Sequence, residues 1–170
     1  PVFSKNDRKV ILEGEGYFEV VSSEKSPFIV TTEHFTLKCT GTEFNVSSYA
    51  SAPEHSVTLV NGKVDISIGD RQIPLRPNER LTVSKDGGHN VSKVDPYRFY
   101  AWKNGEVVFR NDRLEDVLKQ LSLTYNYDFV IKDAEGRDVT ANYVVDEQYG
   151  VCTITPRPIL ITTKSKEFIY

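Results

Sequence analysis

Short runs of alternating side chains fill the first 95 residues and constrain the fold of this chain more than any other feature. In "LEGEGYFEVV", residues 12–21, apolar or small residues take the even positions, and Glu13, Glu15 and Glu19 take odd ones. Successive side chains of a strand point to opposite faces, so this period predicts a strand, here from Lys9 to Val21, with one apolar face. Similar runs, separated by Gly, Pro, Asn and Asp, follow as far as residue 95. The pattern is typical of an all-β fold.

The segment "SVTLVNGKVDISI", residues 56–68, predicts a β-hairpin with a two-residue turn at Asn61-Gly62. The register then opposes these pairs: Val60 and Lys63, Leu59 and Val64, Val57 and Ile66, and Thr58 and Asp65. Alternation places the two apolar pairs on a buried face and Thr58 with Asp65 on a solvated face.

The segment "FIVTTEHFTLKCTGTEFNVSSY" predicts two strands that meet near Glu33 and His34. In the second strand Leu37 and Cys39 share a face, whereas the apolar residues after the "TGT" triplet fall on the opposite parity. A β-bulge at Gly41 accounts for this switch.

The glutamate row is the first candidate for chemistry. Glu13 and Glu15 would lie roughly 6.5 to 7 Å apart at Cα, near the separation of a glycosidase acid and base. No aromatic platform that clearly belongs to a cleft accompanies them, and a solvated strand face accounts for the row without catalysis. A small β-rich hydrolase that uses Glu13 and Glu15 stays open as an alternative.

The other reactive side chains match no known pattern for catalysis, for a metal or for a cofactor. His34, His55 and His89 fit no metal-ligand spacing and lie in or beside predicted turns, so we expect them at the surface. Cys39 shares its face with Leu37 and is interpreted as a small buried hydrophobe. We therefore expect no catalytic residue, no metal and no cofactor. With a net charge of −3 and no basic stripe, the chain is not expected to bind nucleic acid.

The pattern changes after Pro96. The aromatic cluster in "PYRFYAWKNG" is interpreted as the joint between two units, an all-β domain over residues 1–96 and a small α+β unit over residues 97–170. The second unit is predicted as a strand "GEVVFR", a helix, and a strand "YDFVIKD". The helix carries an apolar stripe at helical spacing, and Asp112 with Glu115 resembles a capping box. The stripe consists of Leu114, Val117, Leu118, Leu121 and Tyr125.

The chain begins at Pro1 and contains no methionine, so we expect it to be a piece of a longer protein. No apolar run approaches 18 residues, and a membrane span is therefore not expected within it.

Six blocks in order resemble the FecR-type transmembrane regulators of bacteria, closest to the Bacteroidetes versions that are described as anti-sigma factors. The blocks are "GEGYFEV", "PFIV", "GTEFNV", "VTLVNGKVDI", "LRPNERLTV" and "AWKNGEVVFRNDRLEDVLKQLSLTYNYDFVIKD", and they span roughly residues 8–133. At Asn78 the family more often has glycine, and asparagine also tolerates a positive φ. We carry the resemblance no further than about Asp133.

The resemblance implies a mainly β fold, an all-β sandwich or solenoid-like domain followed by a strand-helix-strand unit. It implies a periplasmic sensor segment of a single-pass inner-membrane protein, whose sigma-binding region and membrane helix lie in a missing N-terminal part. The signal would come from the signalling domain of an outer-membrane TonB-dependent transporter, and an extracytoplasmic-function sigma factor would receive it. A non-catalytic extracytoplasmic module that binds a glycan or a protein is the alternative.

We expect the transporter domain to dock within residues 103–133, where the predicted strands carry no proline guard at their edges. Added strands bind through main-chain hydrogen bonds at such edges. The candidate contact residues are Val107, Val108, Phe109, Phe129, Val130 and Ile131.

Overall fold

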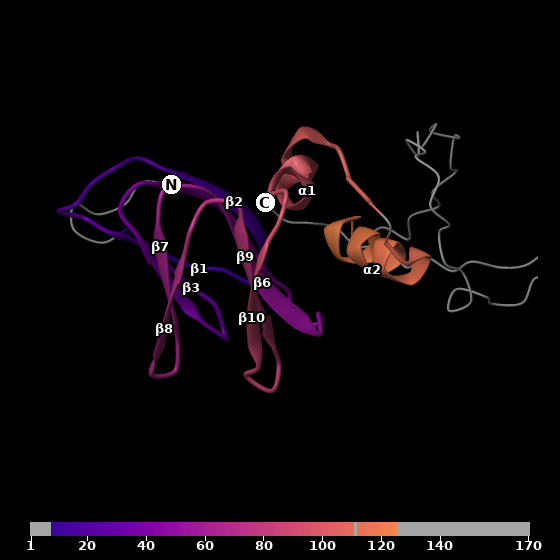
Figure 1. Cartoon of the computed structure of the whole chain (residues 1–170), viewed down its shortest axis with the longest axis horizontal. Coiled ribbons are helices and arrows are strands. Elements are labelled where there is room, and N and C mark those ends of the chain that lie inside the picture. Colours follow the sequence, from indigo (N-terminus) through magenta and orange to yellow (C-terminus); the bar gives the residue numbers. More distant parts are fainter. Residues whose placement is uncertain (1–7, 111, 126–170) are drawn as a thin grey trace, which may run out of the picture.

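The computed structural model describes residues 8–110 and 112–125, which form a β-sandwich of two five-stranded sheets followed by short helices (Figure 1). The first sheet contains, in spatial order, β1 (Arg8–Ile11), β3 (Phe28–Thr31), β4 (Thr36–Cys39), β7 (Val64–Ile68) and β8 (Arg71–Leu75). The second sheet contains, in spatial order, β10 (His89–Lys93), β9 (Glu79–Ser84), β6 (Glu54–Asn61), β5 (Thr42–Ser48) and β2 (Gly14–Val20). The predicted mainly β class is confirmed, and of the two architectures left open, a sandwich or a solenoid-like domain, the fold is the sandwich.

The chain crosses between the two sheets repeatedly instead of completing one sheet first. It leaves the first sheet after β1, β4 and β8, and it returns to that sheet after β2 and β6. The pairings are antiparallel except that of β1 with β3, which is parallel. Each crossing turns the apolar face of the next strand toward the same core, because the two sheets face one another.

The core lies between the two sheets and consists of the apolar side chains that alternation predicted. The largest fully buried apolar side chains are Val30, Leu37, Phe44, Val46, Val57, Leu59, Val64, Ile66, Leu75, Leu81 and Val83. Leu12, Phe18 and Val20 pack against this core, as the even positions of "LEGEGYFEVV" predicted. Cys39 is also buried, so its interpretation as a small buried hydrophobe is confirmed.

The predicted strand from Lys9 to Val21 is in fact two strands. Residues 8–11 form β1 in the first sheet, and residues 14–20 form β2 in the second. Alternation does not reveal the break, because the apolar side chains on both strands face the same core.

The predicted hairpin at Asn61-Gly62 is wrong. Strand β6 pairs with β5 and β9, whereas β7 pairs with β4 and β8, so the turn carries the chain from one sheet to the other. Leu59, Val64 and Ile66 are buried as predicted, but they meet across the sandwich core rather than along a ladder.

The predicted bulge at Gly41 is a second crossing of this kind. Strand β4 ends at Cys39 in the first sheet, and β5 begins at Thr42 in the second, so the parity changes because the chain changes sheet. A register shift does occur between Glu43 and Phe44, where β6 leaves Val60 without an opposite residue.

Several local predictions are confirmed. A turn separates β3 from β4 at Glu33 and His34, and helix α2 (Leu114–Tyr125) covers the predicted amphipathic stretch. Asn78 adopts a φ of 66° as expected, and its backbone N–H donates to the carbonyl oxygen of Leu59 at 2.9 Å.

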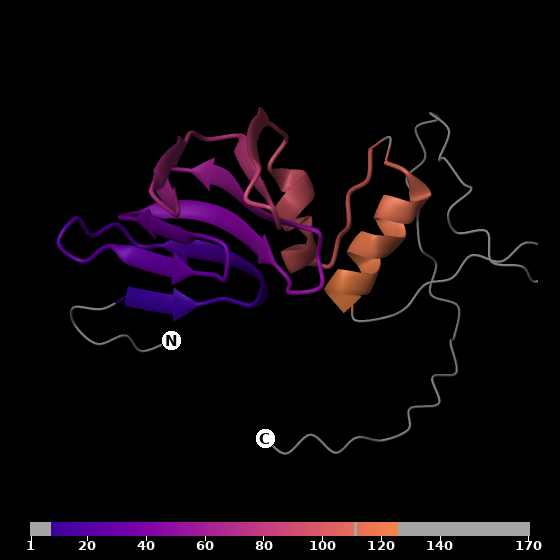
Figure 2. The same ribbon diagram turned by 90° about the horizontal axis from the view of Figure 1, so that it is seen from below.

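The segment after β10 begins with α1 (Tyr97–Tyr100) and the 3-10 helix η1 (Ala101–Asn104), which lie beside the second sheet (Figure 2). The strand predicted at "GEVVFR" is wrong: residues 106–109 have no regular secondary structure. The strand predicted at "YDFVIKD" and the runs toward the C-terminus lie outside the described residues. The proposed division between residues 1–96 and 97–170 stays a prediction.

Candidate functional site

One face of the second sheet is polar, yet its side chains are buried or half-buried. Antiparallel register places Tyr17, Asn45, Thr58 and Arg80 opposite one another across four neighbouring strands. The adjacent row holds Glu15, Ser47, Ser56 and Thr82. We call these two rows the polar face.

An aromatic segment covers this polar face. The segment, residues 97–104, comprises α1 and η1 and carries four aromatic side chains. Asn45, Ser56 and Thr58 retain 2%, 5% and 1% of their exposure. The prediction that Thr58 faces solvent is therefore wrong, because a central strand in this sheet is covered on both sides.

A hydrogen-bonded chain joins the aromatic segment to strand β2. The indole Nε1 of Trp102 donates to Oδ1 of Asn45 at 3.2 Å, and Nδ2 of Asn45 donates to Oε1 of Glu15 at 2.8 Å. The buried Asn45 side chain therefore accepts a hydrogen bond at its amide oxygen and donates one from its amide nitrogen. Asn45 thus links the Glu15 carboxylate to Trp102, which lies 57 positions after Asn45 in the sequence.

Burial raises the pKa of Glu15, and hydrogen bonding to Asn45 and the charge of Arg80 oppose that rise. The prediction that the whole glutamate row is solvated is wrong at this residue. The neighbouring Tyr49 hydroxyl has its pKa raised to about 12 by burial and by the charge of Glu15. Burial therefore favours the neutral form of both side chains.

Arg80 lies at the other end of the polar face. Its guanidinium carbon lies 4.2 Å from the ring centroid of Phe99, and Nη2 donates to Oγ of Ser56 at 3.1 Å. Its buried Nε has no hydrogen-bond partner within the described residues. Burial lowers the pKa of the guanidinium, while the charges of Glu54 and Glu15 favour its protonated form. Phe99 therefore covers a cation that is largely withdrawn from water.

A third group of contacts fixes the outer rim of the aromatic segment. The rings of Tyr17 and Tyr100 lie 5.0 Å apart, and Nζ of Lys103 lies 4.1 Å from the Tyr17 ring centroid. The same ammonium pairs with Glu19 at 3.2 Å. The Tyr17 hydroxyl donates to Glu43, and burial together with that bond raises the pKa of the phenol.

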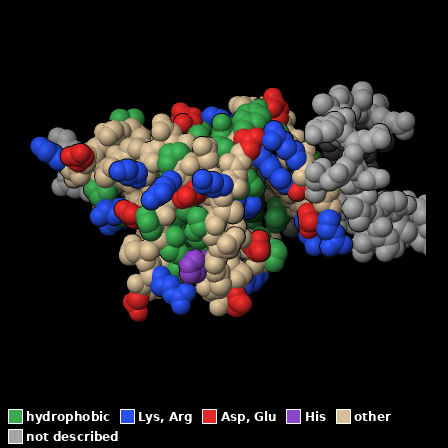
Figure 3. Space-filling view, in the orientation of Figure 1, with side chains coloured by type: hydrophobic (Ala, Val, Ile, Leu, Met, Phe, Trp, Pro, Cys, Tyr) green, Lys and Arg blue, Asp and Glu red, His purple; other side chains and the backbone are tan. Residues whose placement is uncertain are grey.

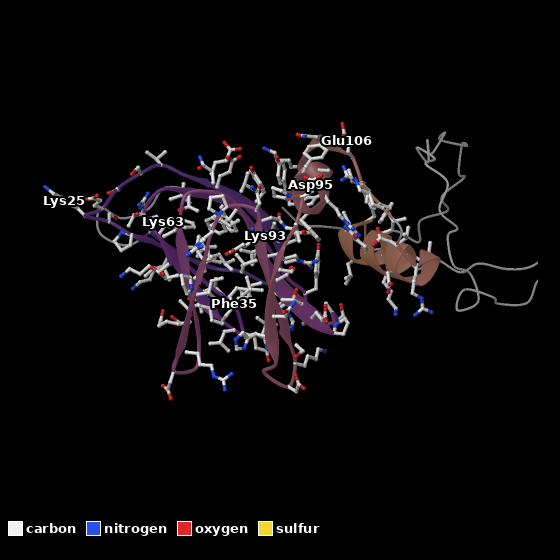
Figure 4. All side chains as sticks on the ribbon, viewed as in Figure 1. Lys25, Phe35, Lys63, Lys93, Asp95 and Glu106 are labelled. Atoms are coloured by element: carbon white, nitrogen blue, oxygen red, sulfur yellow. The ribbon has the colours of Figure 1, made fainter. Side chains whose placement is uncertain are left out.

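Polar contacts continue from the aromatic segment toward α2. Arg98 pairs with Asp112, and Nη2 of Arg110 lies 3.1 Å from Oδ2 of Asp95. Asp95 and Glu106 lie beside α1, and the Tyr97 hydroxyl donates to Glu106 (Figure 4). The segment between the sandwich and α2 is thus tied down at both of its ends.

The two glutamates of the hydrolase alternative occupy different surroundings. Glu13 is exposed and lines an open depression with Gly14, Tyr49, Ala50 and Ser51. Glu15 is half-buried and bonded to Asn45. In a glycosidase the two carboxyl groups flank the bond that is cleaved. The different surroundings of Glu13 and Glu15 therefore give the hydrolase alternative no support.

We expected the three histidines at the surface, and this prediction is wrong for His55, which is 1% exposed. His34 is half-buried and His89 is exposed. Among residues 8–110 and 112–125, no group of three or more His, Cys, Asp or Glu side chains is arranged to hold a metal ion. Lys and Arg interleave with Asp and Glu on the face shown in Figure 3, without a continuous basic patch.

The predicted partner-binding residues divide between two situations. Val107, Val108 and Phe109 are half-buried and belong to no strand, and no other described residue pairs with them in a ladder. The other three candidates, Phe129, Val130 and Ile131, lie outside the described residues.

Sequence reasoning missed the polar face, although a signal for it exists. Asn45, Ser56 and Thr58 are small polar residues that alternate with core residues on two neighbouring strands. Such positions suit a covered polar layer better than an open surface, where longer charged side chains are common. The aromatic cluster downstream supplies the cover.

Comparison with known proteins gives consistent results. Residues 1–65 match the model of the family described as FecR protein. Two crystal structures, each described as of a "putative anti-sigma factor from Parabacteroides distasonis ATCC 8503", are similar to this chain. One has 31% identity over 74% of this chain and a TM-score of 0.67. The other has 27% identity over 84% of this chain and a TM-score of 0.68. No curated protein matches.

The chain spans 59% of the first of these structures and 67% of the second. Within the described ranges, no helix has the length and apolar character needed to cross a membrane.

Proposed function

Because the chain is a FecR-type protein, we propose that it is the periplasmic sensor segment of a transmembrane sigma regulator. In this proposal an outer-membrane TonB-dependent transporter passes its signal to the segment, and the segment controls an extracytoplasmic-function sigma factor through a region outside this chain. The observation that carries the proposal is the likeness over most of the chain to structures described as anti-sigma factors.

The contacts around the aromatic segment support a relay. A signal that arrives near α2 needs a mechanical path to the sandwich, and such a path requires packed or hydrogen-bonded groups between the two sites. Arg98 with Asp112, and Trp102 with Asn45, provide consecutive links of this kind. The path ends at Glu15 on β2.

We place the docking site of the transporter domain within residues 103–133. Val107, Val108 and Phe109 offer three apolar side chains on a segment without regular secondary structure, which lies between η1 and α2. A segment whose backbone groups are not engaged in a ladder with other described residues can accept a strand from a partner. Phe129, Val130 and Ile131 complete the proposed contact set from the sequence alone.

The role is proposed to be non-catalytic. The charged groups of the polar face are engaged with the aromatic segment, and this arrangement serves attachment rather than turnover. Glu15, Asn45 and Trp102 form one connected set, and Arg80 with Phe99 forms a second. We also propose that the longer protein is anchored in the inner membrane by a helix outside this chain.

The test is a titration of isotopically labelled protein with the signalling domain of a transporter encoded beside it. We expect amide shifts within residues 103–125, and we expect Phe109→Ser to weaken binding at least tenfold. Val91→Ser is the matched control, because Val91 is an exposed apolar residue, 39% exposed, on edge strand β10. Shifts confined to residues 8–95 would reject the docking site.

A cellular assay tests the regulatory role separately. Deleting the gene should change expression from promoters of the sigma factor encoded beside it, and the full-length gene should restore it. Unchanged expression, together with binding of the chain to a glycan array, would favour the extracytoplasmic binding module instead.

A further inference from the structure

Two histidines from different sheets stack against each other at one end of the sandwich. His34 lies in the turn between β3 and β4 of the first sheet, and His55 lies on β6 of the second. Their ring centroids lie 3.6 Å apart with an angle of 21° between the ring planes. His55 is 1% exposed, whereas the His34 side chain retains 21% of its exposure.

The turn that carries His34 has a defined shape. Oγ1 of Thr32 accepts hydrogen bonds from the backbone N–H of His34 at 3.2 Å and of Phe35 at 3.1 Å. The backbone N–H of Thr32 donates to the carbonyl oxygen of Phe35 at 2.9 Å, and Phe35 is buried in the core. His34 is therefore placed over His55 by a turn that is anchored on both sides.

The hydrogen bonding of His55 suits a neutral ring. Its Nδ1 lies 3.3 Å from Oγ of Ser48 on β5, and its Nε2 is buried without a hydrogen-bond partner among the described residues. A protonated imidazole carries an N–H at both nitrogens. Protonation of His55 would therefore place a charge, and one unsatisfied N–H, in a buried position beside a second imidazole.

Charged and titratable groups face His55 from two sides. His34 and Glu33 approach from the β3–β4 turn, and Lys85 approaches from the turn between β9 and β10. Burial is the largest cause that lowers the pKa of His55, followed by His34 and Lys85, and Glu33 opposes them. Oε2 of Glu33 lies 3.9 Å from Nε2 of His34 on a side chain that is 80% exposed, so solvent screens its charge.

We propose that the His34–His55 stack is a proton-sensitive contact that fastens the β3–β4 turn of the first sheet to β6 of the second, and that acidification opens it. This device goes beyond the proposed signalling role, because it needs no partner and acts on the sandwich alone. It would make the packing of the two sheets at this end respond to the acidity of the compartment.

The direction of the pH effect follows from proton linkage. An unfolded histidine takes up its proton near pH 6.5. The folded chain takes up the proton on His55 at lower pH, so between these two values the unfolded state binds more protons. The stability of the fold therefore decreases as the pH falls through this interval. Below the pKa of His55 in the folded state, this residue causes no further loss of stability.

The first test is a nuclear magnetic resonance titration of the wild-type protein from pH 8 to pH 5. We expect the ring signals of His55 to titrate below about pH 6.5, the ordinary value of histidine. Amide signals of residues 32–36 and 54–57 should change with the same midpoint. A midpoint at or above this value, or turn amides that do not respond, would overturn the proposal.

The second test compares thermal unfolding at pH 7 and pH 5 in single variants. We expect the midpoint temperature to fall on acidification in the wild type and to fall clearly less in His55→Gln. His34→Gln removes the second largest cause of the lowered pKa of His55, so we expect a smaller reduction of the fall there. His89→Gln is the matched control, because His89 is exposed on β10. If the midpoint temperature of His34→Gln falls on acidification as much as that of the wild type, the proposal is overturned. His34 is half-buried, so this variant decides the test if His55→Gln does not fold.

Discussion

Gly41 and Gly62 lie on two crossings between the sheets and pack directly against each other: a Cβ on Gly62 would lie 2.7 Å from the carbonyl oxygen of Gly41. A Cβ on Gly41 would in turn lie 2.7 Å from Cβ of Ser22. Oγ1 of Thr42 donates to the carbonyl oxygen of Lys63 at 2.9 Å and ties the two crossings together. The absence of a Cβ at these two glycines allows the close approach of the two crossings.

Gly62→Ala is predicted to destabilise the fold by about 2 to 3 kcal/mol, because it adds both a clash and an unfavourable backbone conformation. The φ of Gly62 is 91°. Gly69→Ala is the matched control, since Gly69 also has a positive φ, of 55°, but nothing lies within 4 Å of its Cβ position. Denaturant unfolding should show a larger loss for Gly62→Ala, and equal losses would mean that the close approach has no cost.

The two crossings also explain what the sequence could and could not predict. Alternation identifies which side chain of a strand faces the core, and it did so for Leu12, Phe18 and Leu59. It does not identify the partner strand, because both sheets face the same core and the same residues are buried in either case. The Asn61-Gly62 turn suits a hairpin and a crossing equally well in local terms, so the choice depends on contacts distant in sequence.

The polar face shows the same limit at the level of the site. The odd positions of β2 were correctly grouped on one face, but whether that face meets water depends on residues 97–104. Glu15 and Trp102 are too distant in the chain for any local pattern to connect them. The aromatic cluster was interpreted as the joint between two units, whereas in the fold its side chains contact Tyr17, Asn45 and Arg80 of the second sheet.

Leu59→Ala is predicted to cost about 2 to 5 kcal/mol, because it leaves a cavity between the sheets. Leu59 is 0% exposed, whereas Ile11 is 89% exposed and serves as the control. Ile11→Ala should change the free energy of unfolding by less than about 0.5 kcal/mol. Urea titrations of the two variants measure this difference, and similar losses would contradict the assigned core.

Glu15→Gln is predicted to become more stable relative to the wild type as the pH rises. Burial raises the pKa of Glu15 above 4.5 in the folded state. The wild type therefore loses stability as the pH rises from about 4.5, near the unfolded value, through the folded value, and the neutral amide avoids this loss. Glutamine keeps an oxygen that can accept the hydrogen bond from Asn45.

Urea unfolding between pH 4 and pH 8 measures this effect as the difference in stability between Glu15→Gln and the wild type. Glu13→Gln is the control, at an exposed position between β1 and β2 and two residues from Glu15. A difference for Glu15→Gln that is independent of pH would show that Glu15 is solvated after all.

Asn45 and Trp102 are predicted to be energetically coupled, since one hydrogen bond of 3.2 Å attaches the aromatic segment to the polar face. Asn45→Ala leaves both the indole N–H and Glu15 without their partner, and we expect a loss of about 1 to 3 kcal/mol. Trp102→Phe keeps much of the packing and removes the donor, for a loss of about 1 kcal/mol.

The double variant should lose less than the sum of the two single losses, by about 0.5 kcal/mol or more. Hydrogen exchange then tests whether the attachment reaches further along the chain. If the aromatic segment transmits changes toward α2 through Arg98 and Asp112, amides of residues 97–104 and 112–125 should exchange faster in Asn45→Ala, while those of β7 in the other sheet keep their rates. Additive losses together with unchanged exchange in α2 would mean that the hydrogen bond positions Trp102 alone and that the proposed relay follows another route.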